Sequence, residues 1–202
     1  MNVSARRERS GNGAAARART LTRARLRASA RRLFAERGLH AVTSHQIAEA
    51  AGVASGTFYL HFHDKNELFR ELVFEALAEL ERRLEVSVRP LEAQPEPAAR
   101  ARAEVLLGFA EDHGELVRML FGRGSEGASV GADALDHMVA RIETELAANR
   151  PAGSDPLHPA VTAQALVGMW ARIVTWWAES PGRAPRDAVL QTMIALQLSG
   201  VR

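Results

Sequence analysis

The sequence predicts an all-α protein of about nine helices: an N-terminal three-helix domain with a helix-turn-helix, followed by a larger helical C-terminal domain. Apolar residues recur at helical spacing along most of the 202 residues. We find no stretch in which apolar and polar residues alternate as in a half-buried strand. The breaks between periodic segments fall at the Gly-rich stretch 122–131 and at the prolines of 151–159 and 181–185. A chain of this length can bury about 70% of its unfolded surface, so a substantial core is expected.

The first predicted helix covers residues 22–37 and ends at Gly38. Residues 1–19 are rich in Arg, Ala, Gly and Ser without periodicity, and we predict that they form a disordered basic arm. The N-terminal domain is then expected to span residues 20–66. The apolar face of its first helix consists of Leu26, Ala30, Leu33 and Phe34.

A compact helix-turn-helix is predicted directly after this helix. Thr43 can cap the second helix, and Gln46 three residues later completes a capping box. Gly52 stands where the chain must turn sharply, a place that favours a residue tolerant of positive φ. Phe58 and Phe62 anchor a further short helix by their i, i+4 spacing, and we expect both in the core, with Ile47 of the preceding helix.

The C-terminal domain, residues 67–202, is predicted to be helical throughout. A long helix from about Asp64, its cap, to Val88 leads into it, and Pro90, Pro95 and Pro97 interrupt the chain after that helix. The further helices that the periodicity predicts cover residues 98–113, 115–121, 132–149, 158–178 and 186–199.

The helix-turn-helix segment resembles the DNA-binding signature of the TetR family of bacterial transcriptional regulators. The family motif runs as a capped helix, Ile-Ala-x-x-Ala-Gly-Val, a short turn, Gly-Thr-hydrophobic-Tyr-x-x-Phe and a Lys. The resemblance covers roughly residues 22–75, and beyond that it is only architectural. The residues that carry it here are Ile47, Ala48, Ala51, Gly52, Val53, Gly56, Thr57, Phe58, Tyr59, Phe62 and Lys65.

The resemblance implies a set of phosphate contacts. Tyr59 and Lys65 occupy positions that contact phosphates in similar proteins, and Thr43 is expected to add its hydroxyl or the amide of its helix start. Gly56 would let the backbone approach the duplex closely. For Tyr59, closure of the small core is the structural alternative.

The resemblance also implies base-reading positions. Thr57 and His61 occupy base-facing positions, and Ser55 and Leu60 are candidates to join them, Leu60 through apolar contact alone. An exposed helix residue without a partner is the alternative for His61. Two departures from the family concern the start of this helix: Ala54 stands where a capping Ser is common, so Ser55 is the expected cap. Ser55 also replaces a Lys that many relatives carry.

Charge is divided unevenly along the chain. Residues 1–65 hold twelve Arg or Lys against four Asp or Glu, a net +8, whereas residues 66–202 carry a net −6. A basic head on an acidic body favours contact between the head and a polyanion. Arg17, Arg19 and Arg23 are therefore candidates for the adjacent minor groove, with a solvated tail as the alternative.

Composition argues against several other classes. No apolar run reaches the ~20 residues that span a bilayer, no signal peptide is visible, and there is no Cys, so we expect a cytoplasmic protein without disulfides. Asp133 and His137 have a spacing that suits two metal ligands, but a third ligand is not evident. We therefore expect no metal, no cofactor apart from a small-molecule effector, no membrane partner and no enzymatic activity.

The C-terminal domain is expected to sense a ligand and to dimerise. The helices at about 158–178 and 186–199 are apolar nearly all round, which favours a homodimer built from them, with a purely internal core as the alternative. The resemblance implies a small-molecule pocket in this domain, although ordinary core packing uses the same residue types. Candidates for its lining are Phe109, His113, Met119, Phe121, Met138, Trp170, Arg172 and Trp177.

These expectations combine into one function. The chain is predicted to be a sequence-specific DNA-binding regulator of transcription, a repressor that a small-molecule ligand releases from a palindromic operator. The alternatives are a non-specific or architectural DNA-binding protein and a TetR-like activator. Only the resemblance to the family favours repression over activation.

Overall fold

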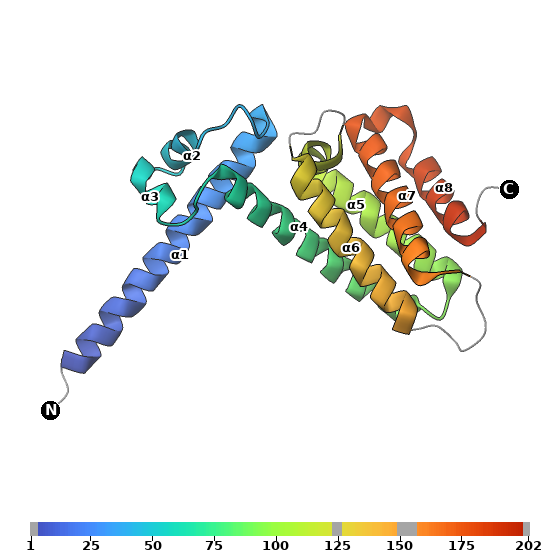
Figure 1. The fold of residues 1–202 in the computed structure, drawn as a ribbon, viewed down its shortest axis with the longest axis horizontal. Helices are drawn as coiled ribbons and strands as arrows, with labels where there is room; N and C mark the ends of the chain where they lie inside the picture. The colour runs from blue at the N-terminus through green and yellow to red at the C-terminus, as the bar shows by residue number, and fades with distance from the viewer. Residues whose placement is uncertain (1–3, 123–126, 149–156, 200–202) are drawn as a thin grey trace. The chain divides into compact units, whose positions relative to one another are not determined.

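The described part of the chain is helical, as predicted. The computed structural model describes residues 4–122, 127–148 and 157–199, and within them it has eight α-helices, two short 3-10 helices and no strand (Figure 1). The chain divides into two compact units, Met1–Leu72 and Val73–Arg202. The division therefore lies somewhat later than the predicted domain boundary at residue 66.

The first unit contains the predicted helix-turn-helix. Its helices are α1 (Ser4–Arg37), α2 (Ser44–Ala50), α3 (Ser55–Tyr59) and the beginning of α4 (Lys65–Ser87). The short α2 packs on both α1 and α3. A single apolar core joins these helices, and its fully buried members include Leu26, Phe34, Ile47, Phe58, Phe62, Leu68 and Phe69.

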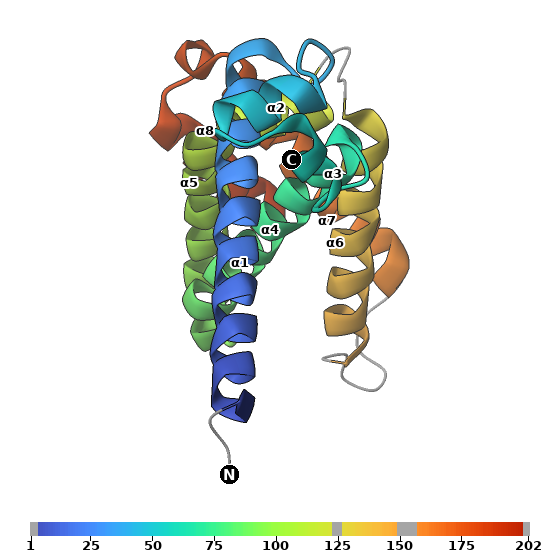
Figure 2. The same ribbon diagram turned by 90° about the vertical axis from the view of Figure 1, so that its left-hand side faces the viewer.

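The chain before residue 20 differs from the prediction. It is not a disordered arm, because α1 begins at Ser4 and continues without a break to Arg37. Figures 1 and 2 both show its first turns extending beyond α2 and α3. Alanine and arginine have high intrinsic helix propensity and no proline interrupts them, so the helix can continue where the apolar periodicity has already stopped.

Helices α5 to α8, with the later part of α4, form the second unit. Helix α7 packs on both α5 and α6, while α8 packs mainly on α5. The apolar core includes Leu107, Val167, Trp170 and Met193. The elements after α4 are the 3-10 helix η1 (Arg89–Leu91), α5 (Pro95–Phe121), α6 (Ala128–Ala148), α7 (Pro159–Glu179), the 3-10 helix η2 (Pro181–Arg183) and α8 (Arg186–Ser199).

A kink in α5 separates the two helices predicted at 98–113 and 115–121. His113 has a non-helical backbone (φ −125°, ψ 26°), so two helical segments meet there within α5. The break predicted beside Gly114 is therefore present as this kink. Helix α5 also starts earlier than predicted, because Pro95 at its first position has the fixed φ that a helix start requires.

Helices α5 and α6 approach each other closely at Gly131. Helix α6 begins at Ala128, inside the stretch predicted as a break, and residues 123–126 of that stretch lie outside the described ranges. A Cβ on Gly131 would lie 2.6 Å from the carbonyl oxygen of Leu120. Glycine is therefore needed at this position because α6 runs against the backbone of α5.

Candidate nucleic-acid interface

The two helices of the helix-turn-helix are held together by local chemistry that the sequence predicts. Thr43 caps α2 through its side-chain oxygen, which accepts from the Gln46 amide at 3.2 Å, and the Gln46 side chain accepts from the Thr43 amide at 2.9 Å. Gly52 has φ +66° in the turn after α2. The rings of Phe58 and Phe62 lie 5.7 Å apart in the core. The capping box, the glycine turn and the buried phenylalanines are therefore confirmed.

Helix α3 presents a mixed polar and apolar surface to solvent. Tyr59 is 62% exposed and Leu60 71% exposed, although both are large. The Tyr59 ring packs only by its edge on Phe58, with ring centroids 5.4 Å apart, so it does not close the core. Thr57 is half-buried, and Gly56 is exposed. An exposed tyrosine and leucine on a five-residue helix suit a surface that a partner covers.

Ser55 is not the cap of α3. The capping position is Ala54, which has no side-chain hydrogen bond there, and Ser55 is the first helical residue. The Ser55 hydroxyl instead lies 2.5 Å from Nδ1 of His45 on α2. The sequence analysis did not consider His45. Its ring fixes the Ser55 hydroxyl and links the two helices of the motif on their exposed side.

His61 follows α3, past the helix end at Tyr59. Its carbonyl oxygen accepts from Nη1 of Arg23 at 2.7 Å, which ties the end of the motif to α1. Burial of the ring lowers the pKa of His61 below its usual 6.5, and the positive charges of Arg19 and Arg23 lower that pKa further. Nδ1 of His61 is buried and has no hydrogen-bond partner among the described residues. The lowered pKa keeps the ring neutral near pH 7, and because Nδ1 is buried, a partner from outside the domain would have to meet Nε2.

The three arginines predicted to reach the minor groove have different surroundings. Arg23 is committed within the domain, because its guanidinium pairs with Glu71 and lies 4.3 Å from the centre of the Phe62 ring. A minor-groove contact of Arg23 would have to replace these interactions, and it stays a prediction. Arg19 reaches only the Leu60 carbonyl, at 3.5 Å, and both Arg17 and Arg19 are exposed on α1.

Lys65 ties two parts of the domain together. Its Nζ donates to the carbonyl oxygens of Leu39 at 2.8 Å, Val42 at 2.7 Å and His40 at 3.2 Å. An ammonium has three donors, so these bonds use all of them. Lys65 thus holds the turn between α1 and α2 against the start of α4, and a phosphate would have to displace one of these carbonyls. The predicted phosphate contact competes with this structural role.

Asp64 caps α4, as the sequence predicts. Its Oδ1 accepts from the amides of Asn66 and Glu67, both at 2.8 Å. The bond from the Glu67 amide is the largest of the effects that lower the pKa of Asp64 below its ordinary value. The cap fixes the direction in which α4 leaves the motif.

A small apolar cavity lies in the second unit, between α4, α5, α6 and α7. It encloses about 70 Å³, the space of roughly two water molecules. Four of the eight predicted lining residues line it, namely Phe109, Phe121, Met138 and Trp170. Whether they contact a ligand stays a prediction.

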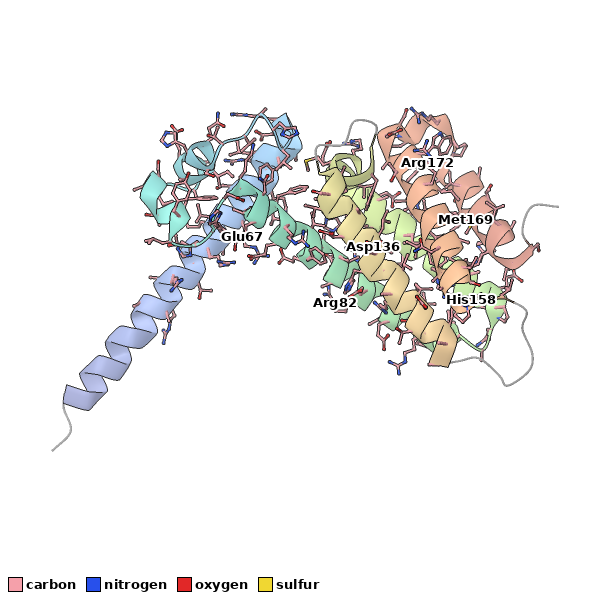
Figure 3. The ribbon with its side chains drawn as sticks, in the orientation of Figure 1. Glu67, Arg82, Asp136, His158, Met169 and Arg172 are labelled. Atoms are coloured by element: carbon pink, nitrogen blue, oxygen red, sulfur yellow. The ribbon has the colours of Figure 1, made fainter. Side chains whose placement is uncertain are left out.

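The other four predicted lining residues lie elsewhere. His113 sits at the kink of α5, where its Nε2 lies 3.4 Å from Oε2 of Glu79. Trp177 is buried and donates from Nε1 to the Ala184 carbonyl at 3.3 Å. Met119 is half-buried but does not line the cavity. Arg172 is exposed on α7 (Figure 3), because the helix turns it away from the core, and it does not line the cavity. Its predicted ligand contact stays a prediction.

Two residues that the sequence analysis missed stand out in the same region. Thr175 lines the cavity and is 1% exposed, and its hydroxyl finds no hydrogen-bond partner among the described residues. Arg102 lies over Trp170, with the guanidinium carbon 5.4 Å from the ring centre. Burial lowers the pKa of Arg102. An arginine three residues before an apolar run was a possible signal, whereas a threonine on a helix gave none.

Other chemistry is not supported by the described residues. In the ranges that the structure describes, no group of three His, Cys, Asp or Glu is placed to hold a metal ion. His137 instead lies 3.1 Å from Glu81. Among the same residues, no helix is long and apolar enough to cross a membrane.

Comparison with known proteins agrees with the geometry of the first unit. Residues 26–72 match the family described as bacterial regulatory proteins, tetR family. The HTH-type transcriptional repressor KstR2 of Mycobacterium tuberculosis (strain H37Rv) is 51% identical over 41 residues, 20% of this chain and 20% of that protein. The chain thus matches about a fifth of the length of this relative.

Solved structures extend the likeness to the whole fold. The fatty acid degradation regulator FadR from Bacillus halodurans has a TM-score of 0.72 at 21% identity, over 89% of this chain and 96% of that one. The transcriptional regulator FadR from Bacillus subtilis, solved with stearoyl-CoA, has a TM-score of 0.62 at 17% identity, over 88% and 98%. At these identities the likeness establishes a shared fold.

Proposed function

We propose that this chain, which carries the N-terminal domain of the tetR family of bacterial regulatory proteins, is a sequence-specific DNA-binding regulator of transcription. The observation that carries the proposal is the surface of α3. Tyr59 at the end of α3 and Leu60 directly after it are exposed, while Phe58 of the same helix is buried and the neighbouring α2 is capped by Thr43. A short, rigidly held helix with exposed reading side chains fits the major groove.

The proposed contacts divide into positioning and reading. Tyr59 and Thr43 bind phosphates, Tyr59 through its hydroxyl and Thr43 at the start of α2. Thr57 and Leu60 face bases, and the neutral ring of His61 adds a donor or an acceptor at the edge of the same surface.

Two further contacts involve backbone and charge. Gly56 allows the backbone of α3 to approach the duplex closely, because it has no side chain to stand between them. The protein itself does not require glycine there, since a Cβ would meet no described atom within 4 Å. Arg17 and Arg19, exposed along the extended α1, supply positive charge that attracts the DNA backbone. Lys65 and Arg23 instead bond to backbone carbonyls of the same domain and hold its parts together.

We propose that two chains pair through α7 and α8. In the single chain, Val161 on α7 is 66% exposed and Leu198 on α8 is 42% exposed, and Met169 and Ile173 are half-buried. A second copy would cover these apolar side chains. A two-fold dimer would then present two helix-turn-helix motifs to the half-sites of a palindrome.

A small molecule bound in the second unit would control DNA binding. Solved structures of this fold include FadR from Bacillus subtilis with stearoyl-CoA and FadR from Thermus thermophilus with lauroyl-CoA, so the fold accommodates acyl effectors. The cavity of this chain is only about 70 Å³, so a ligand must part the helices around it. Such a ligand shifts the population toward the parted form, and we propose that this form releases DNA.

The kink of α5 is suited to transmit this change. Arg83 on α4 pairs with Glu79 and bonds Asp112 at 2.7 Å, while His113 at the kink faces Glu79. Phe109, one turn before the kink, lines the cavity. A ligand that moves Phe109 would therefore act on the kink of α5. The charged network would pass this change on to α4.

Selection of genomic DNA fragments by the purified full-length protein at about 150 mM salt tests the proposal, because non-specific binding is weak there. Recovery of one palindromic motif supports a sequence-specific dimeric regulator. Fragments without a common motif, bound with a steep salt dependence, would instead identify a non-specific or architectural DNA-binding protein. Transcription from a promoter carrying the motif then distinguishes a repressor from an activator.

A further inference from the structure

Thr175 is unlike the other helical threonines of this chain whose bonds are known. Thr20, Thr144, Thr162 and Thr192 each donate to the carbonyl four residues earlier, at 2.7–3.1 Å. Thr175 is more deeply buried than any of these four, yet its hydroxyl has no partner in the described part of the chain. Leaving a buried hydroxyl without a bond is unfavourable, so its retention calls for an explanation.

The surroundings of Thr175 indicate what this hydroxyl is for. All other residues that line the apolar cavity are aliphatic or aromatic, so Thr175 supplies its one polar side chain. An apolar pocket with a single placed polar group is typical of a small-molecule site, in which that group fixes the orientation of the ligand.

A second cavity, of about 60 Å³, adjoins the apolar cavity. Three arginines and four glutamates line it, and we call it the arginine cavity. The same five side chains stand between the two cavities and line both: Leu77, Leu80, Leu106, Met138 and Trp170. Met138 is unbranched and flexible, so it can move aside and open the passage between them.

Among the described residues, two of the three arginines that line the arginine cavity pair with carboxylates and Arg102 does not. Arg141 is bonded to Glu145 at 3.0 Å and lies 3.3 Å from Glu81, and Arg89 pairs with Glu85. Arg102 has no carboxylate within 4.0 Å among the described residues.

The charges near Arg102 do not give its guanidinium a hydrogen-bonded partner within the described ranges. Glu92 and Glu145 favour its charged form from a distance, while burial opposes that form. Glu145 is already bonded to Arg141. The guanidinium, held over Trp170 at the junction of the two cavities, therefore has its hydrogen-bond donors available to an anion.

We propose that the effector is an elongated apolar molecule with an anionic group at one end, held by Arg102, and a hydroxyl or carbonyl oxygen at the other, held by Thr175. This inference rests on the proposed function and names the ligand class of its regulatory site. Trp170 and Thr175 are five residues apart on α7, about 7.5 Å along the helix axis, so the two ends of the ligand lie on the order of 10 Å apart. The apolar middle of the molecule passes Trp170 and Met138.

Titration calorimetry of the purified full-length protein tests this class with three probes. 10-Hydroxydecanoate carries both end groups, decanoate lacks the hydroxyl and 1-decanol lacks the anion. We expect 10-hydroxydecanoate to bind at least tenfold more tightly than either of the others, because each end group adds one hydrogen-bonded contact to a buried partner. Including 10-hydroxydecanoyl-CoA distinguishes a free carboxylate from a coenzyme A thioester as the source of the anion.

Two variants assign the ends. Thr175→Val keeps the shape of the side chain and should weaken 10-hydroxydecanoate about tenfold while leaving decanoate unchanged. Arg102→Met keeps much of the length and should weaken both acids about tenfold or more while leaving 1-decanol unchanged. Thr144→Val on α6, which removes an exposed back-bonded hydroxyl, is the matched control and should change none of the affinities.

The inference is overturned if none of the probes binds, if decanoate and 10-hydroxydecanoate bind equally, or if each variant weakens every probe to the same extent. The last result would mean that Thr175 and Arg102 act on the fold alone. Selection of a DNA motif is measured on the same preparation. A protein that selects its motif but ignores the probes refutes the ligand class only, whereas a protein that selects no motif refutes the proposed function.

Discussion

Replacement of Gly56 by alanine is expected to change the stability of the protein and its affinity for DNA in opposite directions. Gly56 is the second residue of α3 and is exposed, and its φ is not in the left-handed region. A Cβ built there meets no other atom within 4 Å among the described residues. The protein itself therefore has no steric reason for glycine at this position.

The expected effect on the free protein is stabilising. Alanine is favoured over glycine within a helix by about 0.5–1 kcal/mol, because glycine loses more backbone freedom on folding. Since α3 is short and the position is near its start, we expect about 0.5 kcal/mol. A thermal unfolding curve followed by circular dichroism measures this gain.

The expected effect on DNA binding is opposite. If the backbone of α3 approaches the duplex, the added methyl group pushes the helix outward and weakens the neighbouring contacts. Loss of one such contact costs about 1–3 kcal/mol, so affinity for the selected motif should fall about tenfold to a hundredfold. Fluorescence anisotropy with a labelled duplex at about 150 mM salt measures the fall.

Gly108 provides the matched control. It lies within α5, and a Cβ there also meets no other described atom within 4 Å. Gly108→Ala should stabilise the protein similarly and leave DNA affinity unchanged. Unchanged affinity of Gly56→Ala would refute the close approach of α3, and a loss of stability in that variant would refute the claim that the fold tolerates a side chain.

Four further predictions concern the same domain. Lys65→Met should lower the free energy of unfolding by about 1–3 kcal/mol, because three carbonyls lose their donor. Chemical denaturation measures this change, with Arg32→Met at an exposed position as control. An unchanged midpoint would show that the Lys65 hydrogen bonds contribute nothing to stability. Tyr59→Phe should leave stability unchanged and weaken binding to every duplex about equally, whereas an altered sequence preference in a selection experiment would make Tyr59 a base reader. The lowered pKa of His61 means that protonation opposes folding, so stability should fall as the pH drops below 6.5, and His61→Gln should flatten the thermal midpoint between pH 7 and pH 5. The lowered pKa of Asp64 acts in the same direction but in a lower window: its stabilisation is present above the ordinary pKa of 3.8 and is lost as the pH falls further, so the slope below pH 4 should persist in His61→Gln and shrink in Asp64→Asn.

The sequence by itself determined the features of this protein that depend on neighbours within a few residues. The capping box of Thr43 and Gln46, the positive φ of Gly52 and the i, i+4 pair Phe58 and Phe62 all follow from short-range chemistry, and all are present as predicted. Helix positions in the second unit followed from apolar periodicity for the same reason. The all-helical class and the helix-turn-helix were therefore readable without a structure.

Helix ends and bends were less readable, because weak propensities decide them. The first turns of α1 have no apolar face, so periodicity could not reveal that they are helical. The break predicted beside Gly114 is present as a kink at His113, but the local signal cannot show that the two helical segments stay joined in one bent helix. What decides there is packing against helices that are distant in the sequence.

Only the tertiary structure decided which polar side chains are already used within the fold. Lys65 meets carbonyls 23 to 26 residues away, and Arg23 meets a carbonyl 38 residues away, so no local pattern could assign either of them to the interior of the domain. Arg172 and Thr175 stand within one turn of the same helix, yet one faces solvent and the other an apolar cavity. The burial of a side chain, and with it the cost of an unmade bond, depends on which helices pack around it, and that information is not contained in the spacing of residues along one helix.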